Sequence, residues 1–315
     1  MGFDLEALRA AVQRRGRVVR VVIAAVRGSS PREVGAAMLV WKDEQSGTIG
    51  GGALEFAAAT AARRQTVGLQ VSRHALGPDL GQCCGGAVTL LSEVYDVDTV
   101  AALGGDVVAR AMDGAPMPLS VKRLLAQARG TGLRPGAQVL DGWMVEPVSR
   151  PTRDIWIWGA GHVGRALVRV LAPLPDVAIT WVDVAVDRFP EEDYGATIVP
   201  TARPAELVRH APVGAQHLVV TYSHALDLEL CDLLLRRGFG FAGLIGSATK
   251  WARFRSRLAA LGHGAGAIGR ITCPMGAPEL GKHPQMIAVG VAAQMLRPVA
   301  GERADEETFR KDRTA

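Results

Sequence analysis

The sequence predicts an α/β fold, with a C-terminal Rossmann-like domain built on a doubly wound parallel sheet and a smaller N-terminal α/β domain. From residue 154 onward, apolar strand-like segments alternate with helical ones, which is typical of a parallel sheet covered on both faces. Before residue 150, glycine-rich loops separate β-branched segments instead. We therefore expect domains over residues 1–150 and 151–300, and a flexible tail over 301–315.

Composition excludes several classes of protein. The chain has 315 residues, 48% of them hydrophobic, and no apolar run has the length of a membrane span. The N-terminus has no apolar signal core, so we expect a cytoplasmic protein without a membrane partner. The arginines are scattered, which argues against a nucleic-acid partner. Four cysteines, at 83, 84, 231 and 273, form neither a disulfide framework nor a zinc pair.

The N-terminal elements follow from hydrophobic periodicity. We expect helices over 3–14, 53–65 and 98–112, and strands or extended segments over 18–26, 36–41, 71–76, 88–95, 117–123 and 137–148. The segment 18–26 is a continuous β-branched run and is expected to be a buried strand.

The C-terminal elements alternate regularly. We expect strands over 154–158, 177–183, 197–199, 217–222 and 241–245, and helices over 163–171, 204–210, 228–237, 250–261 and 286–296. This order predicts the doubly wound sheet.

The sequence Gly159-Ala160-Gly161-His162-Val163-Gly164 has the form of a Rossmann turn, between an apolar strand and a helix. Asp183 ends the next strand, at the distance expected for an acid that binds a ribose hydroxyl. The candidate phosphate-binding residues are Gly159, Gly161 and Gly164, with Arg188 within reach of a phosphate. Alternatively, these glycines only pack the helix on the strand.

A second glycine run, Gly50-Gly51-Gly52, precedes a helix in the N-terminal domain. Its backbone N–H groups could bind an anion, or the run could be a hinge. The loop that holds Ser29, Ser30 and Arg32 follows a buried strand of the same domain. Because it supplies hydroxyls and a guanidinium, it favours the anion site.

Two further loops carry candidate residues. Cys84 precedes Gly85-Gly86 in a glycine-rich loop, where a thiol is accessible, although free cysteines are more often buried. His224 follows a strand at the carboxyl edge of the expected sheet, where it could be a base or a ligand, or else an ordinary solvent-exposed or capping histidine. Cys231 and Cys273 are expected to be structural, and Lys250 to lie on a solvated helix face.

Several motifs in combination resemble the XdhC/CoxI family of accessory proteins for xanthine dehydrogenase and related molybdenum hydroxylases. They are GSSPR at 28–32, GTIGGGALE at 47–55, CGG at 84–86, GAGHVG at 159–164, TYSHALD at 221–227, GLIGSATK at 243–250, and CPMG with GKHPQMIAVGVAAQ at 273–294. The resemblance spans about residues 17–296. Tyr222 stands where many members have a histidine, and of the two adjacent cysteines Cys84 matches better.

The resemblance implies a chaperone, not an enzyme, that binds the molybdenum cofactor, assists its sulfuration and inserts it into xanthine dehydrogenase. The implied partners are the molybdenum subunit of xanthine dehydrogenase and a cysteine desulfurase, and we expect a homodimer. Cys84 is the candidate ligand of the metal, and a nucleotide at the Rossmann turn is a further possibility. The alternative is an NAD(P)-dependent oxidoreductase that uses this turn.

Overall fold

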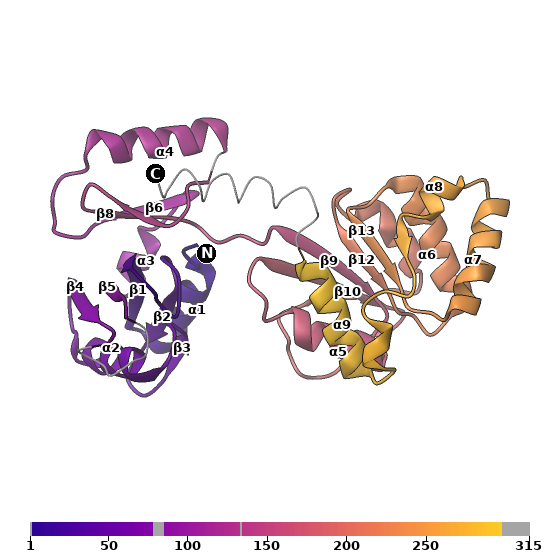
Figure 1. Cartoon of the computed structure of the whole chain (residues 1–315), viewed down its shortest axis with the longest axis horizontal. Helices are drawn as coiled ribbons and strands as arrows, with labels where there is room; N and C mark the ends of the chain where they lie inside the picture. Colours follow the sequence, from indigo (N-terminus) through magenta and orange to yellow (C-terminus); the bar gives the residue numbers. More distant parts are fainter. Residues whose placement is uncertain (1, 78–84, 133, 298–315) are drawn as a thin grey trace. The chain divides into compact units, whose positions relative to one another are not determined.

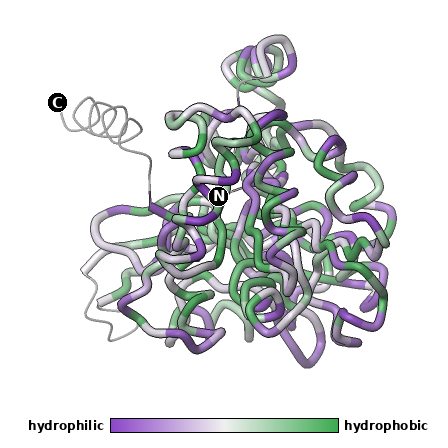
Figure 2. Tube along the Cα trace, turned by 90° about the vertical axis from the view of Figure 1, so that its right-hand side faces the viewer, coloured by the Kyte–Doolittle hydropathy of each residue, from purple (hydrophilic) through white to green (hydrophobic). Residues whose placement is uncertain are grey.

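The computed structural model describes residues 2–77, 85–132 and 134–297. The chain separates into two compact units, Met1–Arg150 and Pro151–Ala315, and each is described by itself (Figure 1). In Figure 2, hydrophobic and hydrophilic residues alternate along the helical turns, as expected for helices that bury one face.

The N-terminal unit is built on a five-stranded antiparallel sheet. Its strands are β1 (Val18–Arg27), β2 (Ala37–Val40), β3 (Gln45–Gly47), β4 (Leu69–Ala75) and β5 (Ala87–Tyr95), in the order β3-β2-β1-β5-β4. The first seven residues of the central strand β1 are all buried, as the β-branched run predicts. Helix α2 (Gly52–Arg64) packs Leu54 and Ala58 against Val21 and Ile23 of this strand.

A three-stranded antiparallel sheet completes this unit. It contains β6 (Val107–Ala111), β7 (Gln138–Leu140) and β8 (Trp143–Pro147) in the order β6-β8-β7, and the unit also holds α1 (Leu5–Arg15), α3 (Val97–Ala101) and α4 (Leu119–Thr131). Three buried charged side chains, together with the nearly buried Arg110, link the two sheets. Arg20 of β1 pairs with Glu146 of β8 at 2.7 Å, and Arg110 of β6 pairs with Glu93 of β5 at 2.7 Å and also with Glu146.

Two expected elements of this unit are wrong. The segment 98–112, expected to be helical, holds the end of the short helix α3 and the strand β6. The segment 117–123, expected to be extended, holds the start of the helix α4.

The C-terminal unit contains a six-stranded parallel sheet. Its strands are β9 (Arg153–Trp158), β10 (Val177–Asp183), β11 (Thr197–Pro200), β12 (Gln216–Val219), β13 (Phe241–Leu244) and β14 (Ile271–Thr272), in the order β11-β10-β9-β12-β13-β14. This is the Rossmann strand order, and it confirms the predicted doubly wound sheet. The order reverses between β9 and β12, so a crevice is expected at the carboxyl ends of these two strands.

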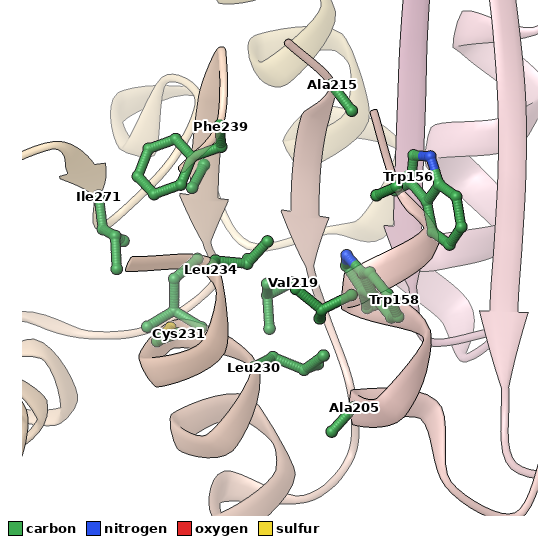
Figure 3. Close-up of a cluster of buried hydrophobic side chains, with 14 of the residues drawn as sticks. Trp156, Trp158, Ala205, Ala215, Val219, Leu230, Cys231, Leu234, Phe239 and Ile271 are labelled. Carbon is green, nitrogen blue, oxygen red and sulfur yellow. The ribbon is translucent and has the colours of Figure 1, made fainter. Parts of the chain in front are cut away.

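Helices cover this sheet on both faces. They are α5 (His162–Leu171), α6 (His224–Arg237), α7 (Ala248–Ala260), α8 (Ala265–Ile268) and α9 (Pro284–Leu296), with short 3-10 helices η1 (Val186–Arg188), η2 (Pro204–His210) and η3 (Pro278–Leu280). Helices α5 and α9 lie side by side and share one core (Figure 1). The other core holds Trp158, Leu230 and Cys231 (Figure 3). Among the described residues, no helix is long and apolar enough to cross a membrane.

Candidate functional site

The glycine-rich motifs of the N-terminal unit converge on one another. Gly86, at the start of β5, packs so closely on the end of β1 that a Cβ there would lie 2.7 Å from the carbonyl oxygen of Arg27 and would also clash with that of Ser29. A Cβ on Gly50 would lie 2.7 Å from the ring of Pro31. Because only glycine permits these approaches, the loops at 28–32, 50–52 and 85–86 form one surface region, which we call the glycine cleft region.

The run Gly50-Gly51-Gly52 forms a left-handed turn that leads into α2. The three residues have φ angles of +121°, +72° and +65°, a conformation that favours glycine at each position. The cap residue of α2, Gly51, has no side chain that could accept a hydrogen bond from the helix N-terminus. The first N–H groups of this helix lie at the positive end of the helix dipole.

The carboxylate of Glu55, in the first turn of α2, reaches back into this turn. Its Oε2 accepts hydrogen bonds from the Thr48 hydroxyl at 2.5 Å and from the N–H groups of Ile49 and Gly51 at 3.0 Å each. Its Oε1 accepts one from Gln45 Nε2 at 3.0 Å. Burial acts to raise the pKa of Glu55, but the hydrogen bonds from Thr48, Gly51 and Ile49 outweigh it, so the pKa lies below its ordinary value.

The remaining candidates of this unit lie around the same turn. Ser30 donates its hydroxyl to the carbonyl of Arg32 at 2.8 Å, which closes the 28–32 loop on itself. The Arg32 side chain pairs with Glu33 at 3.4 Å and is about a quarter exposed. Ser29 and Gly85 are exposed. Cys83 and Cys84 lie outside the described residues, so their predicted roles stay predictions.

The Rossmann turn of the C-terminal unit is tightly packed. Gly159 has a φ of +120°, and a Cβ there would lie 2.6 Å from the carbonyl oxygen of Val220 on the neighbouring strand segment. A Cβ on Gly164 would clash with the carbonyl oxygen of Gly159. Helix α5 begins after Gly161, which makes no side-chain cap. These glycines thus bring helix and strand together, as the packing alternative predicts; whether they also bind a phosphate stays a prediction.

Asp183 directs its carboxylate into this turn. It is 4% exposed, and its two oxygens accept hydrogen bonds from the N–H groups of Ala160 at 2.5 Å and Val184 at 2.6 Å. Arg188 Nε lies 3.7 Å away. Beside it, at the expected crevice, Trp158, Tyr222 and other residues line a hollow of about 10 Å³, which is room for about one water molecule.

Among the described residues, no hydrogen bond joins His224 to the Rossmann glycines. His224 is the first residue of α6 and is exposed, and the preceding Ser223 caps the helix through the N–H of Leu226. Its predicted role as a ligand stays a prediction. Tyr222 is 70% exposed, with the guanidinium of Arg188 5.3 Å from its ring centre.

The sequence analysis missed a buried ion pair at the carboxyl edge of the same sheet. Asp227 is fully buried, and its carboxylate accepts hydrogen bonds from Lys250 Nζ at 2.6 Å and from the Thr221 hydroxyl at 2.7 Å. Lys250 also donates to the carbonyl of Ile245 at 2.9 Å. The expectation that Lys250 lies on a solvated face is therefore wrong. A lysine three residues after the cap Ser247 was the available signal, because such a side chain points back toward the helix N-terminus.

Cys231 and Cys273 flank this pair. Burial, with the nearby Asp227 carboxylate, raises the pKa of Cys231 to about 12. Burial likewise raises the pKa of Cys273 to about 11, against the opposing effect of Lys250. Both therefore stay protonated near neutral pH and are poor ligands or nucleophiles, which agrees with the expectation that they are structural.

Two protein-family models and a solved structure match this chain. A model of the XdhC Rossmann domain matches residues 155–295, and a model of the XdhC and CoxI family matches residues 11–70. A solved structure described as a xanthine dehydrogenase (BH1974) from Bacillus halodurans is 21% identical and superposes with a TM-score of 0.68, over 93% of this chain and 95% of that chain. At this identity, the likeness shows a shared fold.

Other comparisons add little. A myo-inositol dehydrogenase from Corynebacterium glutamicum ATCC 13032 is 14% identical over 38% of this chain and 35% of that chain, with a TM-score of 0.30, too low to support an argument. No curated protein matches the chain significantly. The two family models together match more than half of the chain, in both of its units. The chain belongs to the XdhC and CoxI family.

Proposed function

We propose that this protein is an accessory factor for the maturation of xanthine dehydrogenase, which binds the molybdenum cofactor as cargo in the glycine cleft region. The observation that carries the proposal is the convergence of the loops at 28–32, 50–52 and 85–86. Separate in sequence, they supply bare backbone, the N-terminus of α2 and Arg32 within one surface region. These groups suit a ligand that carries a phosphate and must approach the backbone closely.

The chemistry of the donors fits this cargo. The molybdenum cofactor has a terminal phosphate and a pterin with a dithiolene-bound metal. The N–H groups at the start of α2 and the guanidinium of Arg32 favour the phosphate. Cys84, two positions before Gly86, supplies the soft sulfur that suits a metal–sulfur centre. We further propose that the protein is a homodimer that receives sulfur from a cysteine desulfurase and delivers the cofactor to the molybdenum subunit of xanthine dehydrogenase.

The oxidoreductase alternative finds less support in the Rossmann turn. Its acid, Asp183, is buried and already bonded to two backbone N–H groups, and the adjacent hollow has room for about one water molecule. We therefore propose that this unit does not use a nicotinamide cofactor for hydride transfer.

Loading and transfer test the proposal. The purified protein is mixed with molybdenum cofactor released from a molybdenum enzyme, passed through a gel-filtration column, and assayed for molybdenum per protomer. We expect co-elution, and activation of cofactor-free xanthine dehydrogenase by the loaded fraction. Cys84→Ala should retain much less cofactor than Cys231→Ala, whose thiol is buried in the other unit. Absence of co-elution, or hydride transfer from NADH at ordinary enzyme rates, would contradict the proposal.

A further inference from the structure

We propose that Glu55 is a built-in competitor for the anion site of the glycine cleft region, whose carboxylate occupies the glycine turn until an anionic oxygen of the cargo displaces it. This inference deepens the proposed function and rests on it. It assigns the regulation of the site to Glu55, in the first turn of α2.

The first step concerns the donors that Glu55 uses. A hydroxyl and two backbone N–H groups, from Thr48, Ile49 and Gly51, converge on the single oxygen Oε2. Backbone N–H groups that converge in a glycine-rich turn bind anionic oxygens, those of phosphates included. The Oε2 atom of Glu55 therefore stands where a phosphate oxygen would be bound, and the two cannot occupy the position together.

The second step concerns how easily the carboxylate can leave. Thr48 and Gly50 are exposed, and Glu55 is partly exposed. Outside this turn, its carboxylate has one further hydrogen bond, from Gln45. Rotation about its side-chain bonds would bring the carboxylate into water, where a charge is fully solvated. When the Glu55 carboxylate is displaced, it therefore exchanges hydrogen bonds to the protein for hydrogen bonds to water, and no buried charge is left behind.

Asp183 provides the contrast within the same chain. Its carboxylate also bonds to an N–H of a glycine-rich turn, that of Ala160, but it is 4% exposed. Displacing it would move a charge within a buried environment, which is costly. Of the two turns whose N–H groups bond to a carboxylate, an incoming anion can therefore displace Glu55 but not Asp183.

The third step is the consequence for a carrier. When the binding-competent state is only a fraction of the population, the apparent dissociation constant rises by the inverse of that fraction. Glu55 in the turn lowers that fraction and weakens cargo binding. Its return to the turn after release satisfies the same donors again, so an empty site does not expose them.

A purely positioning role for Glu55 makes the opposite prediction, because removal of the carboxylate would then loosen the turn and weaken anion binding. The experiment is a titration with inorganic phosphate of the full-length protein labelled with ¹⁵N-glycine, followed through the amide resonance of Gly51. We expect phosphate to bind most tightly to Glu55→Ala, less tightly to Glu55→Gln, and least tightly to the wild type. The gain for Glu55→Ala should be roughly tenfold in the dissociation constant.

Glu44→Ala is the matched control, because Glu44 lies in the same unit, is largely exposed and pairs with Arg15. It should bind phosphate as the wild type does. The reverse order of affinities, equal affinities, or a Gly51 resonance that phosphate does not shift in any variant would overturn the inference. Cofactor retention by the same variants is measured separately. Phosphate binding in the expected order without cofactor retention contradicts only the proposed cargo, whereas cofactor retention with the reverse order contradicts only the role of Glu55.

Discussion

His217 is a buried, neutral histidine within the core of the C-terminal unit. It is 1% exposed, and its Nδ1 accepts a hydrogen bond from Trp158 Nε1 at 3.2 Å. Burial, and secondarily the charge of Arg237, lower its pKa to about 4. In the unfolded chain the pKa is near 6.5, so the folded state binds fewer protons between these two values. Stability is therefore complete above pH 6.5 and declines as the pH falls toward 4.

We expect the free energy of unfolding of the wild type to fall by roughly 1.5 kcal/mol from this residue between pH 6.5 and pH 5. Urea denaturation at the two pH values measures it. His217→Gln has no titrating ring, so its free energy of unfolding should change less between the two pH values. This difference does not depend on how much stability the variant loses at both pH values through poorer packing. An equal pH dependence in the two proteins would show that His217 does not carry the effect.

The glycines of the site were identifiable from the sequence, whereas the role of Glu55 was not. Gly28, Gly50 and Gly86 belong to the glycine-rich motifs found in the sequence, where close approach of the backbone was expected only beside Gly86, and the structure shows close approaches at all three. The occupation of the turn by Glu55 was not predicted, because a glutamate in the first turn of a helix ordinarily faces solvent. Only the three-dimensional path of the turn brings the N–H groups of Ile49 and Gly51 to its carboxylate.

At the scale of elements, errors arose where local propensity and tertiary pairing disagree. The stretch after Val97 contains helix formers, and Asp96 and Thr99 form a capping box, but Gly104 and Gly105 end the helix early. Strand β6 then forms because it pairs with β8, a partner some forty residues away that local periodicity cannot reveal. Helix α4 begins directly after its cap residue Pro118, inside the segment that was expected to be extended. The strands of the parallel sheet were predictable, because burial on both faces makes them continuously apolar.

The buried charges between the two sheets of the N-terminal unit are another feature of this scale. Arg20 and Glu146 are 2% and 0% exposed, and their two hydrogen bonds, of 2.7 and 3.0 Å, join β1 to β8. Removal of one partner leaves the buried cluster of Arg20, Glu93, Arg110 and Glu146 with one uncompensated charge, and this costs about 3–5 kcal/mol.

We therefore expect Glu146→Gln to lower the free energy of unfolding by about 3 kcal/mol or more, measured by urea denaturation. Asp106→Asn is the matched control, because it breaks an ion pair with Arg150 in the same unit whose side chains are about half exposed. The control should lose less than about 1 kcal/mol. Similar losses in the two variants would mean that burial does not determine the strength of these pairs.

At the scale of the whole molecule, each unit contains its own hydrophobic cores. The clusters around α2 and α1 consist only of residues before 150, and the two clusters that flank the parallel sheet consist only of residues after 151. A unit with its own core can in principle fold alone. The glycine cleft region lies entirely within the first unit, whereas the Rossmann turn lies entirely within the second.

This separation predicts that residues 1–150 fold as an isolated fragment and retain the molybdenum cofactor about as well as the intact chain, because every proposed contact to the cargo lies in this unit. Residues 151–315 should also fold but retain none. Circular dichroism and cooperative thermal unfolding check the folding of each fragment, and gel filtration followed by molybdenum analysis checks the binding. A folded first fragment that retains no cofactor, or a second fragment that does retain it, would place the cargo site outside the glycine cleft region. The test thus assigns the cargo to one unit independently of any single side chain.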